Sequence, residues 1–258
     1  MTGSVPGVRL VTWNLQQSSG RALDAQVSFL AGLKPDLISV QETYRGEVEN
    51  FRSTLSQRTG QAWDARYAPA VRLVDGNRGG GIAVFSTLPI QDSEAILLEH
   101  PDRWTRARPA LRVRVTHPPT GVAFDVYAAH LASGDDATAS RQKQVDELVR
   151  FAGRSGVPRL LGGDLNAVAT APEIASQATP HGAGLAADYV DAWVAVGRSG
   201  GETWPAERPE RRIDYWFVAR VSQSVLTPIE ASVPDVCSGR SACLSDHRPL
   251  VLELKVND

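Results

Sequence analysis

The sequence predicts an α/β protein built in layers. Short runs of apolar and β-branched residues, each about the length of one strand, alternate with longer segments in which apolar residues recur at helical spacing. Such alternation is typical of helices packed against β-sheets. No repeat, low-complexity block or Gly/Ser-rich linker divides the chain. We therefore expect one domain over residues 1–258, with residues 1–7 forming a disordered or tag-like segment.

Eight strands are predicted from the short apolar runs. They are expected over residues 8–13, 36–40, 81–86, 111–116, 122–129, 157–161, 213–218 and 249–256. The first and sixth are apolar enough to be buried strands. The fourth and fifth are expected to form a hairpin, because Pro118, Pro119 and Gly121 favour a turn between them.

Three helices are predicted from apolar residues that share one helical face. The marker residues are Leu23, Val27 and Leu30 in the first helix, Val48, Phe51 and Leu55 in the second, and Val145, Leu148, Val149 and Ala152 in the third, which covers residues 137–152. The first two helices fall between the first three strands. The third lies between the predicted hairpin and the sixth strand, so each helix can connect two strands of a layered sheet.

Polar side chains recur where the predicted strands end. Asn14, Glu42, His130 and Asp164 each follow an apolar run, and Asp246-His247 precedes the last one. Ligand sites in α/β proteins gather at strand ends, because the strands fix the loops that follow. We therefore expect these residues to share one rim of the sheet.

The carboxylates of that set predict a site for a hard divalent cation. Glu42, Asp164 and Asp246 could each serve only as a helix cap, a turn residue or a surface ion-pair partner. Asp214 is harder to explain in that way, because it lies in an otherwise apolar strand and needs His, Arg or a metal as partner. Converging carboxylate and amide oxygens suit Mg²⁺ or Mn²⁺.

Two of the five histidines are candidates for acid–base chemistry. His130 follows Ala128-Ala129, and His247 lies in Ser245-Asp246-His247-Arg248-Pro249. Either could act as an acid, a base or a hydrogen-bond donor to phosphate. The other three lie among Pro and Gly and are interpreted as surface residues. They are His100, His117 and His181.

Composition excludes binding driven by bulk charge alone. The formal net charge is −2, and 42% of the residues are hydrophobic, as in an ordinary globular protein. No apolar run is long enough to span a membrane, and the first eight residues do not resemble a signal peptide. We expect a monomer without a stable protein partner.

The two cysteines leave the cellular compartment open. Cys237 and Cys243 are separated by five residues, and no Cys or His pair completes a zinc site with them. They form either two free thiols or a disulfide. We expect a cytoplasmic protein in the first case. A disulfide, together with a removed leader, would indicate secretion.

Seven short segments resemble the endonuclease/exonuclease/phosphatase superfamily in order and spacing. They are Trp13-Asn14, Gln41-Glu42-Thr43, the Gly-Gly-Gly-Ile-Ala-Val-Phe-Ser run of residues 79–86, His130-Leu131, Gly163-Asp164-Leu165-Asn166, Arg212-Ile213-Asp214-Tyr215 and Ser245-Asp246-His247-Arg248-Pro249. The chain looks most like bacterial members related to deoxyribonuclease and to 5′-tyrosyl-DNA phosphodiesterase. The resemblance implies a four-layer α/β/β/α sandwich, with two mixed sheets face to face and helices outside.

The resemblance also implies a role for each residue in hydrolysis by in-line attack of water on phosphorus. Glu42 matches the principal metal ligand, with Asn14 and Asp246 beside it. Asp164 and Asn166 match residues that orient or activate the water. Asp214 matches the partner of His247, which contacts the scissile phosphate. His130 matches a position that is His in the deoxyribonuclease and sphingomyelinase branches and Tyr in AP endonucleases.

The substrate implied is a phosphodiester, most of all in nucleic acid. Gln16 stands where several AP endonucleases have an acidic residue, and no apolar docking hairpin or Lys-rich insertion of the lipid and inositol branches is evident. Candidate substrate contacts come from arginine-rich segments near the expected rim. They are Arg103, Trp104, Arg106 and Arg108, then Arg212 with its neighbours Arg208 and Arg211, and also Arg45 and Arg78. The arginines of the first group could instead form surface ion pairs.

Two alternatives remain. A phosphoesterase acting on a small molecule or a lipid headgroup is compatible with the modest net charge. A binding protein that lost catalysis would be expected to lack at least one residue of the set, whereas all are present.

Overall fold

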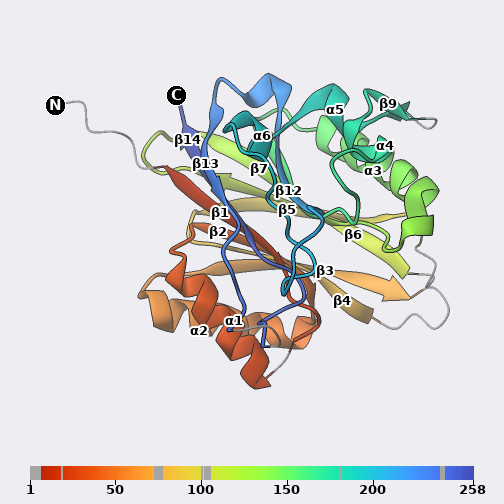
Figure 1. Ribbon diagram of the computed structural model, residues 1–258. Helices are drawn as coiled ribbons and strands as arrows, with labels where there is room; N and C mark the ends of the chain where they lie inside the picture. The colour runs from red at the N-terminus through yellow and green to blue at the C-terminus, as the bar shows by residue number, and fades with distance from the viewer. Residues whose placement is uncertain are drawn as a thin grey trace.

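Twelve strands form one mixed sheet that curls between two groups of helices (Figure 1). The computed structural model describes residues 7–18, 20–72, 78–99, 101, 106–179, 182–238 and 242–258. The strand order is β11-β12-β8-β7-β6-β3-β4-β2-β1-β14-β13, with β5 paired to β6. Residues 1–6 lie outside the described part, so the prediction of a disordered or tag-like segment stays untested there.

The strands confirm all eight predicted runs, and several extend further than predicted. Their bounds are β1 Val8–Asn14, β2 Leu37–Thr43, β3 Asp64–Arg72, β4 Arg78–Ser86, β5 Ile90–Leu98, β6 Arg106–Thr116, β7 Ala123–His130, β8 Arg159–Asp164, β11 Tyr189–Asp191, β12 Asp214–Ala219, β13 Leu226–Ser232 and β14 Leu250–Val256. A separate pair is formed by β9 Ala178–Thr179 and β10 Gly182–Ala183.

Two strands escaped prediction because each contains a proline. Pro69 lies inside β3 and Pro228 inside β13, and the pairing register shifts beside both. Proline lacks the N–H that a regular ladder needs, so an internal proline argues against a strand unless a bulge accommodates it. β5 was missed as well, because only its last residue is buried and its apolar pattern is weak, and so was β11, which has only three residues.

The sheet folds over at the short β3–β6 pairing, which joins Val71 to Ala107 and Arg72 to Arg106. Apolar side chains from both sides of this joint enter one core, including Leu10 and Leu252 from one half and Val126 from the other. The expected mixed α/β layering is therefore present. Two separate sheets are not confirmed, because hydrogen bonds make the sheet continuous.

Helices cover the outer side of each half (Figure 1). α1 Gly20–Gly32 and α2 Arg45–Thr59 pack with β1, β2 and β4 through the predicted residues Leu23, Val27, Leu30, Phe51 and Leu55. α3 Thr138–Gly153 packs on β7, β8 and β12 through Val145, Leu148, Val149 and Ala152. Short helices follow: η1 Asp135–Ala137, α4 Pro172–Ala175, α5 Leu185–Asp188, α6 Ala192–Ala195 and η2 Arg220–Ser222. No helix within the described residues is both long and apolar enough to cross a membrane.

Glycines let β8 approach its neighbours closely. Gly162 pairs with Trp216 of β12, and a Cβ on Gly162 would lie 2.2 Å from that ring. Gly163 has φ +135°, and its Cβ would lie 1.9 Å from the carbonyl oxygen of Ala129. Both glycines therefore serve the packing that places the next residue, Asp164.

One histidine prediction is wrong. His117, expected at the surface, is 3% exposed, and its Nδ1 lies 3.0 Å from Thr120 Oγ1. The Thr120 and Gly121 N–H groups also donate to the His117 carbonyl oxygen, so the turn is closed around this residue by hydrogen bonds that residue types alone do not reveal. His100 and His181 lie outside the described residues.

Candidate active site

Three adjacent strands bring His130, Asp164 and Asp214 into one row. Asp164 pairs with His130 in the parallel β7–β8 ladder and with Asp214 in the antiparallel β8–β12 ladder. All three are nearly or fully buried. Residues directly opposite in neighbouring strands project to the same face of a sheet. The row is therefore a direct result of strand register.

A second pair comes from β1 and β2 in the other half of the sheet. Asn14 ends β1 and pairs with Gln41, the residue before Glu42. Glu42 lies at a register shift between Gln41 and Thr43 and has φ 59°. This left-handed conformation is unusual for a residue other than glycine and is found where the surrounding structure holds it. Gly80 approaches the Glu42 backbone so closely that a Cβ would lie 3.0 Å from it.

A hydrogen bond across the fold connects the two groups. Asn14 donates from Nδ2 to Asp164 Oδ2 at 3.0 Å, although the two residues lie 150 positions apart. Asn166 adds a local turn, with its backbone N–H donating to Asp164 Oδ1 at 2.9 Å and its side chain donating to the Leu131 carbonyl oxygen. Both oxygens of Asp164 are therefore fixed.

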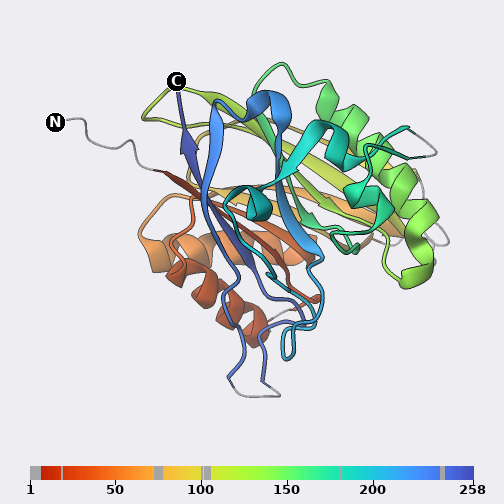
Figure 2. The same cartoon turned by 45° about the horizontal axis from the view of Figure 1, so that its top comes forward.

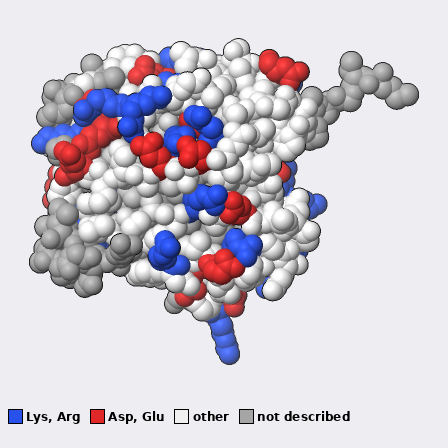
Figure 3. Space-filling view, turned by 180° about the vertical axis from the view of Figure 1, so that it is seen from behind, with Lys and Arg blue, Asp and Glu red and all other residues white. Residues whose placement is uncertain are grey.

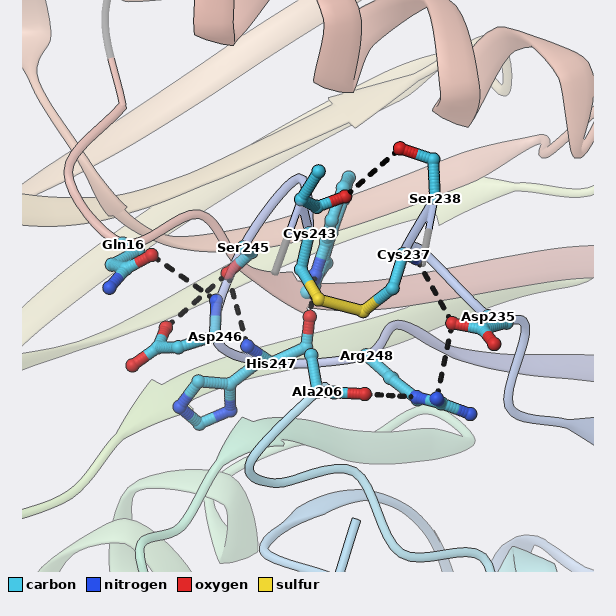
Figure 4. Close-up of a disulfide and its surroundings, with 12 residues drawn as sticks. Gln16, Ala206, Asp235, Cys237, Ser238, Cys243, Ser245, Asp246, His247 and Arg248 are labelled. Carbon is cyan, nitrogen blue, oxygen red and sulfur yellow. Dashed lines mark hydrogen bonds and ion pairs between the residues drawn. A yellow bond between two sulfur atoms is a disulfide. The ribbon is translucent and has the colours of Figure 1, made fainter. Parts of the chain in front are cut away.

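The loop before β14 completes the site (Figure 4). Ser245 donates to the Asn14 carbonyl oxygen at 2.7 Å, and the Asp246 N–H donates to Gln16 Oε1 at 3.2 Å. The indole N–H of Trp13 donates to the His247 carbonyl oxygen at 2.8 Å. These bonds tie the loop to the end of β1, so Asp246 and His247 lie beside Asn14.

The environment of His247 favours its charged form. Its Nδ1 lies 2.9 Å from Asp214 Oδ2, and its Nε2 lies 3.7 Å from Asp164 Oδ2. Burial opposes the positive charge, but the negative charges of Asp214 and then Asp164 outweigh it and raise the pKa of His247 to about 10. The two carboxylates therefore favour the imidazolium at neutral pH, with Nδ1 donating to Asp214 Oδ2.

His130 is held in its neutral form. Burial, followed by the positive charges of Arg108 and His247, keeps the pKa of His130 well below its usual value. Arg108 Nη1 lies 3.1 Å from Nδ1 of the ring. The same Arg108 nitrogen lies 3.4 Å from Nε2, so the shorter contact favours Nδ1 as the acceptor, with the proton on Nε2, because arginine can only donate. Nε2 lies 3.4 Å from Asp164 Oδ2.

Asp164 is a carboxylate whose affinity for a proton is increased. Burial is the main cause, and the neighbouring charge of Asp214 adds to it, so the pKa of Asp164 is raised to about 7. The positive charge of His247 and the hydrogen bonds from Asn14 and Asn166 act in the opposite direction. A carboxyl group with such a pKa is suited to accept a proton near neutral pH.

The predicted residues surround a cleft of about 640 Å³. Seven of the eight predicted catalytic residues line it; Asp214 lies behind His247. The loops before β12 and β14 project from the same end of the molecule (Figure 2), and both contribute residues to the cleft, among them Arg211 and Asp246. The lining that sequence reasoning did not assign comprises Ser133, Gly134, Asp135, Asp136, Trp204 and Ile213. The acidic pair five residues after His130 was a visible signal for part of it.

Of the predicted substrate-binding residues whose side chains are described, Arg211 alone lines this cleft. Arg212 forms an ion pair with Asp191 at 2.7 Å, and Arg45 lies over the Tyr67 ring. Arg108 is buried against His130, and Arg106 is half-buried at the start of β6. Arg103 and Trp104 lie outside the described residues, as does the side chain of Arg78. Their roles in substrate binding stay predictions.

Two sets of side chains at this site could supply metal ligands. In the described part of the chain, atoms of Asp164, Asp214 and His247 lie within 4.8 Å of one another. A metal at this group would have to displace a proton from His247, because a nitrogen ligand must be deprotonated. Glu42, Asn14 and Asp246 instead border the cleft directly and offer oxygen atoms. Their donor chemistry fits a hard divalent cation.

Cys237 and Cys243 form a disulfide beside this loop (Figure 4). Of the two alternatives left by the sequence, the structure contains the bonded one. Only Leu244 separates Cys243 from Ser245. The disulfide therefore closes a small loop at the entrance to the catalytic segment.

We expect the double variant Cys237→Ser, Cys243→Ser to unfold about 2 kcal/mol more easily than the disulfide-bonded protein, because a loop of this size loses its cross-link. Turnover should change little, since Ser245, Asp246 and His247 keep their bonds to β1. Urea unfolding of both proteins checks the first expectation. Adding a reducing agent to the urea should lower the stability of the parent protein and leave that of the variant unchanged. A large loss of turnover in the variant would show that those bonds are insufficient.

A curled mixed sheet with a buried Asp-His pair and oxygen ligands at its strand ends defines a hydrolase that acts on phosphate esters with a divalent metal. The model of the Endonuclease/Exonuclease/phosphatase family matches residues 11–247, and the chain belongs to this family. Members are metal-dependent phosphoesterases and nucleases, and this protein is an enzyme of that class.

Solved structures share the fold at low sequence identity. A humanized TDP2 from D. rerio has a TM-score of 0.73 and 18% identity, covering 97% of this chain and 99% of its own. An endonuclease/exonuclease/phosphatase from Beutenbergia cavernae has a TM-score of 0.74 and 21% identity, and the match covers 97% of this chain and 72% of its own. The human Nocturnin catalytic domain with bound sulfate has a TM-score of 0.72 and 18% identity, and the match covers 98% of this chain and 95% of its own. No curated protein matches the chain in sequence.

Proposed function

We propose that this protein hydrolyses phosphodiester bonds in nucleic acid, as a nuclease or a DNA-end phosphodiesterase. The observation that carries the proposal is the Asp214–His247–Asp164 arrangement beside Asn14 in one open cleft. It combines a fixed positive donor for a phosphate oxygen with a carboxylate that can accept a proton from water.

In this proposal Asp164 acts on the attacking water and His247 acts on the phosphate. Asp164, held by Asn14 and Asn166, orients the attacking water and takes its proton. His247, charged and oriented by Asp214, donates to the scissile phosphate. His130 donates from Nε2 at the same rim. Fixed donors of this kind stabilise the charge that develops in the transition state.

Mg²⁺ or Mn²⁺ is the proposed cofactor, held by Glu42 with Asn14 and Asp246. Five carboxylates line the cleft against a single arginine among its described lining residues, so a cation is needed to balance their charge before a phosphate can enter. When bound, such a cation would neutralise the phosphate and the departing oxygen.

Incubation with plasmid and with labelled oligonucleotides, with and without a chelator, tests the proposal. Cleavage that requires Mg²⁺ or Mn²⁺ is expected. Absence of metal-dependent cleavage of both substrates would remove nucleic acid as the substrate.

A small phosphodiester or a lipid headgroup is a second candidate, favoured by the distribution of charge. The cleft is mostly acidic, and basic and acidic side chains lie side by side on the face opposite to that of Figure 1 (Figure 3). Extended contact with a polyanion requires clustered basic residues. A panel of phosphorylated sugars, inositols and phospholipids distinguishes the two. Turnover confined to that panel would favour the second.

The alkaline limb of the pH profile should depend on Asp214. With His247 active as an imidazolium, turnover is expected to fall as pH rises through about 10. Asp214→Asn removes the main charge that raises the pKa of His247, so the fall should begin at lower pH. The measurement is kcat from pH 7 to 10.5 (about the range that brackets this ionisation). An unchanged limb would contradict the assigned role of Asp214.

A further inference from the structure

Arg211 is the only arginine or lysine among the described residues that line the cleft, and five carboxylates surround the same space. Its side chain is 47% exposed. A phosphate that enters the cleft therefore meets one exposed arginine besides His130 and His247.

The backbone beneath Arg211 is fixed. Trp204 and Arg211 exchange backbone hydrogen bonds of 3.0 and 2.9 Å, and the guanidinium lies 5.7 Å from the centre of the Trp204 ring. Thr203 Oγ1 accepts from the Ile213 N–H at 3.3 Å, so this loop is anchored at the start of β12. Arg211 is thus presented at a defined place near Asp214.

The guanidinium of Arg211 forms an ion pair with Asp135, which begins η1 and also lines the cleft. Arg211 Nη1 lies 3.0 Å from Asp135 Oδ1, in an ion pair between elements 76 residues apart. Arg141 holds the Asp135 side of the rim, donating to the Gly134 carbonyl oxygen at 2.7 Å and to Glu173. The pair therefore spans two fixed rims, but only its side chains need to move to open it.

This ion pair is exchangeable. The Asp135 side chain is 89% exposed, and exposed ion pairs contribute little to stability. A phosphate offers arginine two acceptor oxygens in the bidentate geometry that it prefers. Asp135 thus occupies Arg211 when no substrate is bound and can be displaced by a stronger anion.

We propose that Arg211 binds the phosphate next to the scissile one and leaves Asp135 to do so. This inference rests on the proposed function and assigns a second phosphate subsite to the same cleft. Arg211 then determines specificity for substrates with at least two phosphates, and Asp135 weakens their binding by competing for the guanidinium.

The test compares dinucleotides that differ by one phosphate. The dinucleotide d(TpT) has only the scissile phosphate, whereas d(pTpT) and d(TpTp) have a second one on either side. For the parent enzyme we expect a lower KM for at least one of the latter two. Arg211→Ala should remove that advantage, raising KM about tenfold or more with kcat nearly unchanged and d(TpT) unaffected. With oligonucleotides, the dependence of log KM on log salt should become shallower by about one contact.

Two further variants separate binding from loop support. Asp135→Asn should lower KM for the two-phosphate substrate, because it frees Arg211. Arg150→Ala, which removes an exposed arginine paired with Asp146 on α3 away from the cleft, should leave KM unchanged. A rise of KM in both Arg211→Ala and Asp135→Asn would show that the ion pair only supports the rim and would overturn the inference. So would an equal KM for all three dinucleotides. If bis(p-nitrophenyl) phosphate is hydrolysed and no dinucleotide is cleaved, the result contradicts the proposed nucleic-acid function. The inference about Arg211 then falls too, because it rests on that function.

Discussion

We expect His247→Asn to lower kcat by about 10²–10⁴-fold while the protein stays folded. The imidazolium supplies the positive donor that faces the scissile phosphate in the proposed reaction, and asparagine carries no charge. Asparagine can still donate to Asp214 Oδ2, which now accepts from Nδ1 at 2.9 Å. The substitution therefore removes the charge without leaving the buried carboxylate unpaired.

Steady-state kinetics on the metal-loaded enzyme measure the loss of turnover. Thermal unfolding and near-UV circular dichroism show whether the fold persists. A kcat within a few-fold of the parent value, in a folded variant, would mean that His247 does not contact the reacting phosphate.

Glu42→Gln should abolish most of the metal dependence and lower kcat/KM by about 10²–10⁴-fold. Several kcal/mol of charge stabilisation depend on the metal, and each 1.4 kcal/mol corresponds to about a factor of ten. Glutamine keeps the shape of the side chain and can still contact Gln17, which now donates to Glu42 Oε2 at 3.3 Å. The negative charge at the bulge in β2 is lost.

Calorimetric titration with Mn²⁺ gives a readout independent of turnover, and binding should weaken at least tenfold in this variant. Glu49→Gln is the matched control, because Glu49 is exposed on α2 and bonds only to Arg52 in the described structure. Equal Mn²⁺ affinity in both variants would place the metal elsewhere, with the Asp164, Asp214 and His247 group as the alternative.

Strand and helix positions followed from local pattern. Leu23, Val27 and Leu30 mark a helix because that spacing gives one apolar face, and the same residues are buried in the fold. The pattern failed where another constraint intervened. Pro69 and Pro228 concealed two strands, and the weak apolar signal of β5 concealed a third. The joining of both halves through β3 and β6 involves two residue pairs, too few to leave a mark in the sequence.

Most side chains of the candidate site could also be selected from the sequence alone. Asn14, Glu42, His130 and Asp164 were predicted at strand ends, and each lies in the last two residues of its strand. Their convergence depends on register, which sequence reasoning did not supply. Asp164 lies opposite both His130 and Asp214, and a shift by one residue would move it to the other face.

The substrate side of the cleft is where sequence reasoning was weakest. Arg208, Arg211 and Arg212 were all selected from the run before Asp214, yet of the three Arg211 alone lines the cleft, and Arg212 turns away to Asp191. Adjacent residues in an extended segment point in opposite directions, so composition alone cannot choose between them. Arg108 does not line the cleft either, because it is buried and contacts the His130 ring.

The sequence by itself determined the family, the types of side chain at the catalytic site and the class of reaction they can perform, because these depend on residue identity and order along the chain. The tertiary structure decided which protonation states those side chains adopt and which arginine lies in the cleft. Both depend on burial and on distances between residues such as Asn14 and Asp164, or Asp135 and Arg211, that lie far apart in the chain.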